Sequence, residues 1–297
     1  MRKVVIDTSG VEAVLIAGPT ASGKSAFALA LAQSKDGVII NADSMQVYAE
    51  MRVLTARPSP DEEALVPHRL YGHVSARESY SVGRWLDEVA TEIAAAKSQG
   101  RLPIIVGGTG LYFNALLEGL SPIPPIPDDI RSHWRAAGAV TPAAELHAEL
   151  TKRDSLTASQ LIPTDRQRIV RALEVIDATG RPLAEWQKIR GQPLLAADQV
   201  AKLVIAPPRN VIYDNCERRF RHMVEQGALD EADRMRRMQL PGDMPAMGAL
   251  GLSQLVACLR GEMSREAAIQ AATQQTRRYI KRQLTWLNRY MISWKRC

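Results

Sequence analysis

The sequence predicts an α/β protein: a parallel sheet flanked by helices, with an inserted mainly helical domain and a helical C-terminal part. Three observations support this fold class. Buried-strand patterns alternate with helix patterns over the first 120 residues, a proline-rich segment then interrupts the alternation, and helix patterns dominate most of the remaining chain. Because such alternation is typical of parallel strands joined by helices, the first part is expected to contain the sheet.

The predicted strands are short and almost continuously apolar, as in strands that are buried on both faces. They are EAVLIAG (12–18), GVIINAD (37–43), LPIIVGG (102–108) and KLVIAPPR (202–209). A strong helix former, residues 25–34, follows the first strand. Residues 81–100 carry apolar side chains at a helical period that closes at a glycine.

A domain boundary is expected at SPIPPIPDDI, residues 121–130, because its four prolines are incompatible with helix and with sheet. Helix patterns then begin at DDIRSHW, TPAAELHAEL, TDRQRIVRALEVIDATG and LAEWQKIR. Since the strand at 202–209 would rejoin the first sheet, we predict a core of residues 1–120 plus 200–297 and a helical insertion at 121–199.

The chain is moderately basic, with 297 residues, a net charge of +6 and an excess of Lys and Arg after residue 277. Such an excess indicates a polyanionic partner. The three cysteines lack paired spacing, so neither a disulfide framework nor a zinc site is supported. No apolar run approaches the ~18 residues of a membrane span. A cytoplasmic protein is expected.

A glycine-rich turn, GPTASGKS, lies between the first strand and the first helix. This is a P-loop: its backbone N–H groups hold phosphate, its Lys supplies a charge, and its Ser hydroxyl ligates Mg²⁺. The motif does not identify the anion, and Asp43 after the second strand could organise Mg²⁺, act as a general base or cap a turn. The predicted phosphate-binding residues are Gly18, Pro19, Thr20, Ala21, Ser22, Gly23, Lys24 and Ser25, with Ser25 as the metal ligand.

Four blocks together carry a more specific signal than the P-loop alone. GPTASGKS, INADSMQVY (40–48), LPIIVGGTGLY (102–112) and IKRQLTWLNR (280–289) resemble, in order and spacing, the tRNA dimethylallyltransferases. That family transfers the dimethylallyl group of dimethylallyl pyrophosphate to N6 of the adenosine 3′ to the anticodon (position 37). The resemblance covers almost the whole chain and implies Mg²⁺ as cofactor, tRNA as partner and a monomeric protein.

The resemblance also implies roles for individual residues. The P-loop would hold the pyrophosphate, and Asp43 would accept the proton of the weakly nucleophilic N6. Thr20, Lys24 and Arg219 would be the other catalytic residues. The residues implied to bind tRNA are Asp43, Ser44, Met45, Gln46, Thr109, Arg131, Gln167, Arg168, Ile169, Val170, Arg171, Lys281, Arg282, Gln283, Leu284, Thr285, Trp286, Leu287 and Asn288.

The sequence departs from the family pattern at one place. Gly251 is kept, but Leu252 and Ser253 stand where the family usually has an aromatic and a basic residue, so any stacking or phosphate contact there is in doubt. Three alternatives remain open: an adenylate isopentenyltransferase, a small-molecule kinase and an RNA-binding NTPase. A basic C-terminal helix and the insertion argue against the first two, and the third lacks a second acidic motif.

Overall fold

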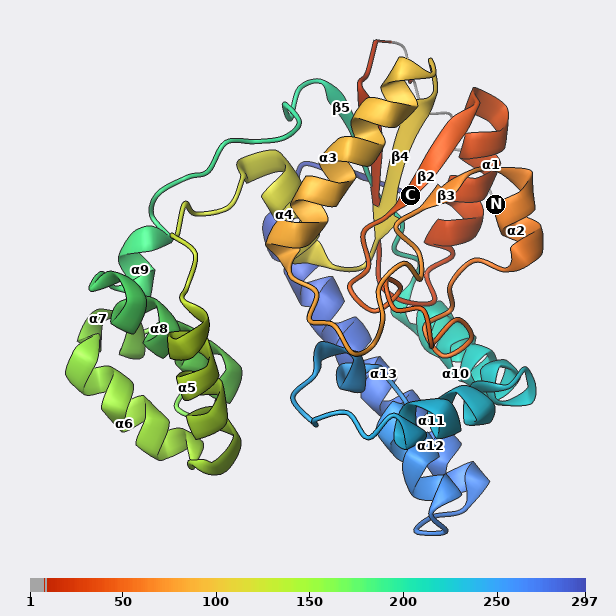
Figure 1. Ribbon diagram of the computed structural model, residues 1–297. Helices are drawn as coiled ribbons and strands as arrows, with labels where there is room; N and C mark the ends of the chain where they lie inside the picture. Colours follow the sequence, from red (N-terminus) through yellow and green to blue (C-terminus); the bar gives the residue numbers. More distant parts are fainter. Residues whose placement is uncertain (1–7, 9) are drawn as a thin grey trace. The chain divides into compact units, whose positions relative to one another are not determined.

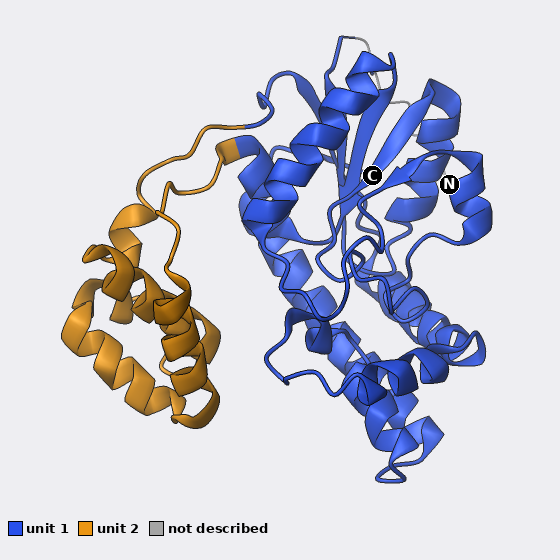
Figure 2. Cartoon of the chain, in the orientation of Figure 1, with its two compact units in different colours: residues 1–117, 194–297 blue, residues 118–193 orange. Residues whose placement is uncertain are grey.

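A computed structural model describes residue 8 and residues 10–297, and its chain divides into two compact units (Figures 1 and 2). The first unit comprises residues 1–117 and 194–297, and the second comprises residues 118–193. The chain therefore leaves the first unit and returns to it. Each unit has its own hydrophobic core.

A parallel sheet forms the centre of the first unit, as predicted. Within the described residues it has six strands in the order β3-β2-β4-β1-β5-β6, and every pair is parallel. All carboxyl ends therefore lie at one edge, where the segments after β1, β2 and β4 are neighbours. The strands are β1 (Ala13–Ala17), β2 (Gly37–Asn41), β3 (His68–Arg69), β4 (Leu102–Gly107), β5 (Val200–Val204) and β6 (Lys295–Arg296).

The two faces of the sheet support two apolar clusters, because successive strand residues point to opposite sides. Leu15 of β1 belongs to the larger cluster, whereas Val14 and Ile16 belong to the other. The fully buried Trp85 of α3 packs in the larger cluster, and Ala28 of α1 packs in the second. Figure 1 shows these helices on either side of the strands.

The helices of the first unit surround the sheet and then continue beyond it. α10 packs against α13, and α12 packs against both α11 and α13. Local signals set several starts: Ser81 caps α3, and Ser59 and Glu62 form a capping box at α2. The helices are α1 (Lys24–Lys35), α2 (Pro60–Leu65), α3 (Val82–Ser98), α4 (Gly110–Glu118), α10 (Arg209–Glu225), α11 (Ala228–Arg237), the 3₁₀ turn η1 (Pro245–Gly248), α12 (Leu252–Leu259) and α13 (Arg265–Tyr290).

The second unit is helical throughout its regular structure. α8 is central, since α5, α6 and α9 all pack against it, and its Ile169 and Leu173 are fully buried. Asp165 caps this helix, and Gly180 ends it in a left-handed conformation. The four predicted helix starts are confirmed, and one short helix was not predicted. The helices are α5 (Asp128–Val140), α6 (Ala143–Arg153), α7 (Ser155–Ala158), α8 (Arg166–Thr179) and α9 (Leu183–Trp186).

The fourth strand differs in its bounds from the prediction of residues 202–209. β5 ends at Val204, and the two prolines at 207 and 208 lie before α10. Proline has no N–H to donate to a ladder, so the strand cannot continue through them. Among the described residues, no helix combines the length and apolar character that a membrane crossing requires.

Candidate active site at the carboxyl edge of the sheet

The P-loop turns tightly at the end of β1, and glycine is required at two of its positions. A Cβ at Gly18 would stand 2.5 Å from the carbonyl oxygen of Ile205, which is backbone and cannot move aside. Gly23, the residue before α1, has φ +88°, where a side chain is strained. The loop therefore leads directly into the N-terminus of a helix, the usual place for a bound phosphate.

Lys24 is the principal cation of this loop. Its ammonium donates to the carbonyl oxygen of Pro19 at 3.3 Å and so lies over the loop. Burial lowers the pKa of Lys24 to about 8; the charge of Asp43 opposes this shift, and that of Arg219 adds to it. A bound anion would counter the effect of burial and favour the protonated ammonium.

Two serines of the loop have hydroxyls available to a ligand. The Ser22 hydroxyl is buried and has no hydrogen-bond partner within the described part of the chain. Buried polar groups are normally paired, so this hydroxyl fits a site that is completed by an anion. The Ser25 side chain is exposed at the first turn of α1, where a metal bound to phosphate could reach it.

The donor set fits Mg²⁺ only together with a phosphate-bearing substrate. No group of three or more His, Cys, Asp or Glu residues able to hold a metal occurs among the described residues. Mg²⁺ commonly takes one or two protein oxygens and completes its shell with water and substrate phosphates. The exposed Ser25 hydroxyl beside the phosphate loop is such an oxygen.

Arg219 joins this group from a distant part of the sequence. It lies on α10, and its guanidinium donates a hydrogen bond to the hydroxyl of Thr20. Burial lowers the pKa of Arg219, while nearby Cys216 and Asp43 act in the opposite sense. Lys24 and Arg219 thus both contact the P-loop, and their binding of pyrophosphate stays a prediction.

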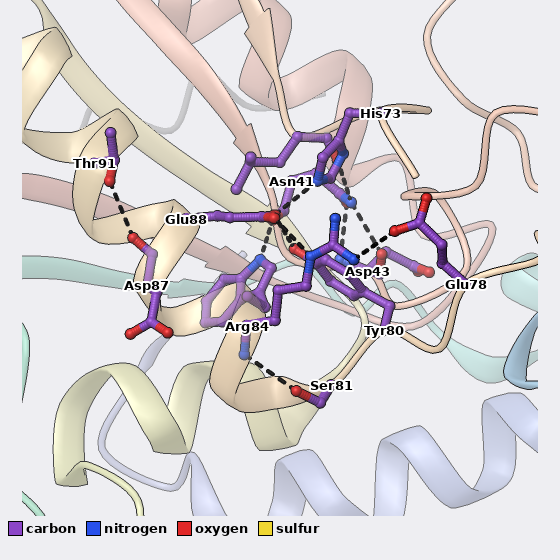
Figure 3. A network of polar contacts seen from close by, with 12 residues as sticks. Asn41, Asp43, His73, Glu78, Tyr80, Ser81, Arg84, Asp87, Glu88 and Thr91 are labelled. Carbon is purple, nitrogen blue, oxygen red and sulfur yellow. Dashed lines mark hydrogen bonds and ion pairs between the residues drawn. The ribbon is translucent and has the colours of Figure 1, made fainter. Parts of the chain in front are cut away.

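Asp43 follows β2, and Asn41, the last residue of that strand, holds it in place. The buried Asn41 amide accepts the Asp43 N–H at 2.8 Å and donates to the Asp43 carbonyl at 2.9 Å and to that of Leu70 at 3.0 Å (Figure 3). The Trp85 indole N–H in turn donates to the Asn41 carbonyl at 2.8 Å. One Asp43 carboxylate oxygen accepts the Met45 N–H at 2.9 Å, so the carboxylate is fixed at the head of the next segment.

The second glycine turn, after β4, is pressed against the segment that carries Asp43. A Cβ at Gly107 would lie 2.0 Å from the carbonyl oxygen of Ala42. Thr109 donates its N–H to that same carbonyl at 3.2 Å, and its hydroxyl accepts the Ser44 N–H at 3.0 Å. Thr109 therefore connects two of the predicted blocks.

A single side chain from α13 joins both glycine turns. The Gln283 amide oxygen accepts the Thr20 N–H at 3.0 Å, and its NH₂ donates to the Gly108 carbonyl at 2.9 Å. Gln283 is 7% exposed and its amide is hydrogen-bonded inside the protein, so its predicted contact with tRNA stays a prediction.

Other predicted tRNA-binding residues differ in their availability. The side chains of Ile169 and Leu287 are buried in hydrophobic clusters and do not lie at the surface, so their predicted contacts with tRNA stay predictions. Gln46 donates its amide to the Thr55 and Ala56 carbonyls, so that donor is not free to read a base. The α8 and α13 residues predicted to contact RNA and found exposed are Gln167, Arg168, Arg171, Lys281, Arg282, Thr285 and Asn288.

The remaining predicted contacts are partly buried. Arg131 donates to Asp128 and to the Ile126 carbonyl, which holds it at the start of α5. At the departure from the family pattern, Leu252 is buried in the core whereas Ser253 is exposed. The other partly buried predictions are Ser44, Met45, Thr109, Val170, Leu284 and Trp286.

Sequence reasoning missed the side chain that holds the Asp43 backbone in place, Asn41. Burial raises the pKa values of Tyr71 and Tyr279, and the charge of Asp43 adds to the rise. Asn41 could have been found, because it precedes Asp43 within the INAD run.

Comparison with known proteins gives one consistent result. A family model described as IPP transferase matches residues 46–290, and one described as isopentenyl transferase matches residues 11–75. The chain is 52% identical over 284 residues to tRNA dimethylallyltransferase of Azorhizobium caulinodans, covering 96% of this chain and 91% of that protein. It is 53% identical over 275 residues to the Bradyrhizobium sp. protein of the same name, covering 93% and 89%.

Solved structures agree with these sequence matches. The tRNA isopentenylpyrophosphate transferase of Bacillus halodurans is 34% identical with a TM-score of 0.66, over 96% of this chain and 88% of that one. A eukaryotic dimethylallyltransferase described as acting on tRNA is 26% identical with a TM-score of 0.78, over 93% of this chain and 69% of that one.

Proposed function

This chain belongs to the IPP transferase family, and from that premise we propose that it transfers the dimethylallyl group of dimethylallyl pyrophosphate to N6 of the adenosine 3′ to the anticodon of tRNA. In this reaction N6 attacks the allylic carbon C1, the bond from C1 to the pyrophosphate oxygen breaks, and pyrophosphate leaves. The N6 proton passes to a base. One observation carries the assignment: the phosphate loop and Asp43 lie at the same edge of one sheet, and Gln283 links the loop to Gly108, where an added Cβ would lie 3.5 Å from the Asp43 carboxylate.

The cationic half of the site stabilises the leaving group. Charge accumulates on pyrophosphate as the bond to C1 breaks, and the P-loop N–H groups, Lys24 and Arg219 surround the place where it would lie. Because burial lowers the pKa of both cations, their charges act in surroundings poor in water, where they are stronger. When bound through Ser25 and the phosphates, Mg²⁺ would neutralise further charge on the leaving group.

Asp43 is the proposed general base. N6 is a weak nucleophile because its lone pair is delocalised into the adenine ring, so a carboxylate that accepts its proton assists the attack. The Asn41 amide holds the backbone N–H and carbonyl of Asp43, and the Met45 N–H holds its carboxylate.

The RNA is proposed to bind through exposed residues. An anticodon-loop base must leave its stack to enter an enclosed site, at a cost of a few kcal/mol. Phosphate contacts from Arg168 and Arg171 of α8, and from Lys281 and Arg282 of α13, would supply affinity without sequence information. Ser44 directly follows Asp43, the proposed general base, and its N–H is bonded to the Thr109 hydroxyl. We propose that this residue also contacts the RNA.

The decisive test is incubation with labelled dimethylallyl pyrophosphate and Mg²⁺ in the presence of either tRNA or AMP. Label on tRNA, lost when the target adenosine is replaced by guanosine, supports the proposal. Label on AMP would indicate an adenylate isopentenyltransferase instead. Absence of label from both, with ATP turnover, would indicate a kinase or NTPase and contradict the proposal.

We further propose that the protein acts as a monomer in the cytoplasm. The reaction described needs no residue from a second copy, since the phosphate loop, Arg219 and Asp43 all come from one chain. Light scattering of the active protein at micromolar concentration is the appropriate check. A dimer whose dissociation removes activity would contradict this proposal.

A further inference from the structure

Gln283 occupies an unusual position between the two substrate loops. Its amide accepts from the P-loop at Thr20 and donates to the second glycine turn at Gly108, residues that are 263 and 175 positions away in the chain. The two partners determine the orientation of the amide, because an N–H must face its oxygen and a carbonyl must face its nitrogen. Both polar functions of the side chain are therefore committed to setting the separation of the loops.

Gly108 is the residue that connects this amide with the proposed base. A Cβ at Gly108 would meet the Gln283 amide nitrogen at 2.4 Å, the Gly18 carbonyl oxygen at 3.4 Å and the Asp43 carboxylate at 3.5 Å. The P-loop, the amide and the carboxylate thus surround a single backbone position, at which any side chain would displace the end of the Gln283 amide. A displacement of the P-loop, the amide or the carboxylate would therefore change the position of the other two.

We propose that Gln283 is a positioning residue, which holds the pyrophosphate loop at the distance from Asp43 that in-line attack by N6 requires. This inference rests on the proposed function. Reacting atoms must approach to about 3–3.5 Å, and a misplacement of about 1 Å can cost ~10²-fold in rate. The helix that carries Gln283 also carries the exposed Lys281, Arg282 and Thr285, so the same helix would touch RNA on its outer face and position the loops from its inner face.

The test is Gln283→Met, which keeps the length of the side chain and removes both hydrogen bonds. We expect kcat for transfer to fall by ~10²-fold while the Kd for tRNA changes less than twofold. The mispositioned site should also hydrolyse more donor: water attacks C1, the C1–O bond breaks, and dimethylallyl alcohol and pyrophosphate form. The expected signature is a rise in alcohol produced per prenyl group transferred.

A matched control lies on the same helix. Gln275 accepts the Gly251 N–H at 3.3 Å, two turns away from the site, so Gln275→Met removes a similar hydrogen bond without touching the loops. It should leave kcat and the hydrolysis ratio unchanged. If both variants lose activity in proportion to their thermal stability, Gln283 is only structural. If Gln283→Met instead weakens tRNA binding at unchanged kcat, it is an RNA contact and the inference fails.

A second variant changes the other partner of the hydrogen bond between Gln283 and Gly108. Gly108→Ala places a methyl group against the end of the Gln283 amide, a flexible group that can move, so the protein should fold. We expect the same fall in kcat and the same rise in hydrolysis. A wild-type protein that transfers no label would contradict the proposed function itself, whereas normal wild-type transfer with unaltered Gln283→Met and Gly108→Ala variants would overturn only this inference.

Discussion

The guanidinium of Arg219 donates a hydrogen bond to the Thr20 hydroxyl and so ties α10 to the phosphate loop. In the proposed reaction, this guanidinium would stabilise the charge that develops on the leaving pyrophosphate. We expect Arg219→Gln to lower kcat/KM for dimethylallyl pyrophosphate by ~10²–10³. Steady-state kinetics at saturating tRNA measure this. The neighbouring Arg218 is exposed, so Arg218→Gln is the control and should retain activity.

The pH dependence of donor binding should report the lowered pKa of Lys24, about 8 in the free protein. The protonated ammonium attracts pyrophosphate and its deprotonation removes that attraction. Binding should therefore be strongest below that pKa, and the Kd should rise by up to tenfold per pH unit above it. Calorimetric titration from about pH 7 to about pH 10 measures the curve. Arginine does not deprotonate in this pH range, so the Kd of the Lys24→Arg variant should not rise above pH ~8.

Salt dependence should identify a phosphate contact on α8. The Arg168 side chain is 75% exposed, with its guanidinium 3.3 Å from Asp165, whereas the Arg153 side chain is 42% exposed. Arg168→Gln should weaken binding of all tRNAs alike and reduce the slope of log K against log salt by about 1. In contrast, Arg153 is already paired with Glu149 and Asp177, so Arg153→Gln should leave the slope unchanged. Equal slopes for wild type and Arg168→Gln would exclude this contact.

The hydrogen bond from the Trp85 indole to Asn41, the residue that holds Asp43, should contribute measurably to stability. The Trp85 indole stacks on Tyr112 with ring centroids 4.3 Å apart; Trp85→Phe replaces it with a smaller aromatic ring and removes the indole donor to the buried Asn41 carbonyl. An unsatisfied buried acceptor costs about 1–3 kcal/mol, so the free energy of unfolding in urea should fall by that amount. Trp294 meets Phe113 edge-on in the same core, and Trp294→Phe provides the comparison. A Trp85→Phe protein as stable as wild type would contradict the proposed strength of this bond.

The sequence was most informative where a local pattern determines the structure. Strands β1, β2 and β4 are predictable because each is a continuous apolar run that ends in a turn signal, and Gly18 and Gly23 are predictable from the loop they must form. The two-residue strands β3 and β6 are too short to carry a period of their own. Their place in the sheet depends on partners far away in the chain.

In the site, too, residues set by a local pattern could be predicted, and residues set by distant partners could not. Lys24 could be predicted from the P-loop motif, which requires a cation at that position, whereas the proposed roles of Asp43 and Arg219 were implied by the resemblance to the family. The role of Gln283 is not readable, because its partners at Thr20 and Gly108 become neighbours only after folding. In the sequence, Gln283 lies within a basic helix segment, and this position suggests an RNA contact. The structure shows that its side chain is buried and bonded to the two loops.

Single-turnover transfer by Asp43→Asn, with tRNA binding measured on the same samples, tests the proposed chemistry most directly. The variant keeps the size of the side chain and an oxygen that can accept the Met45 N–H, but it cannot take a proton from N6. We predict a transfer rate lower by ~10²–10⁴ with tRNA affinity within twofold of wild type. A variant that transfers the dimethylallyl group at the wild-type rate would contradict the assignment of Asp43 as the base.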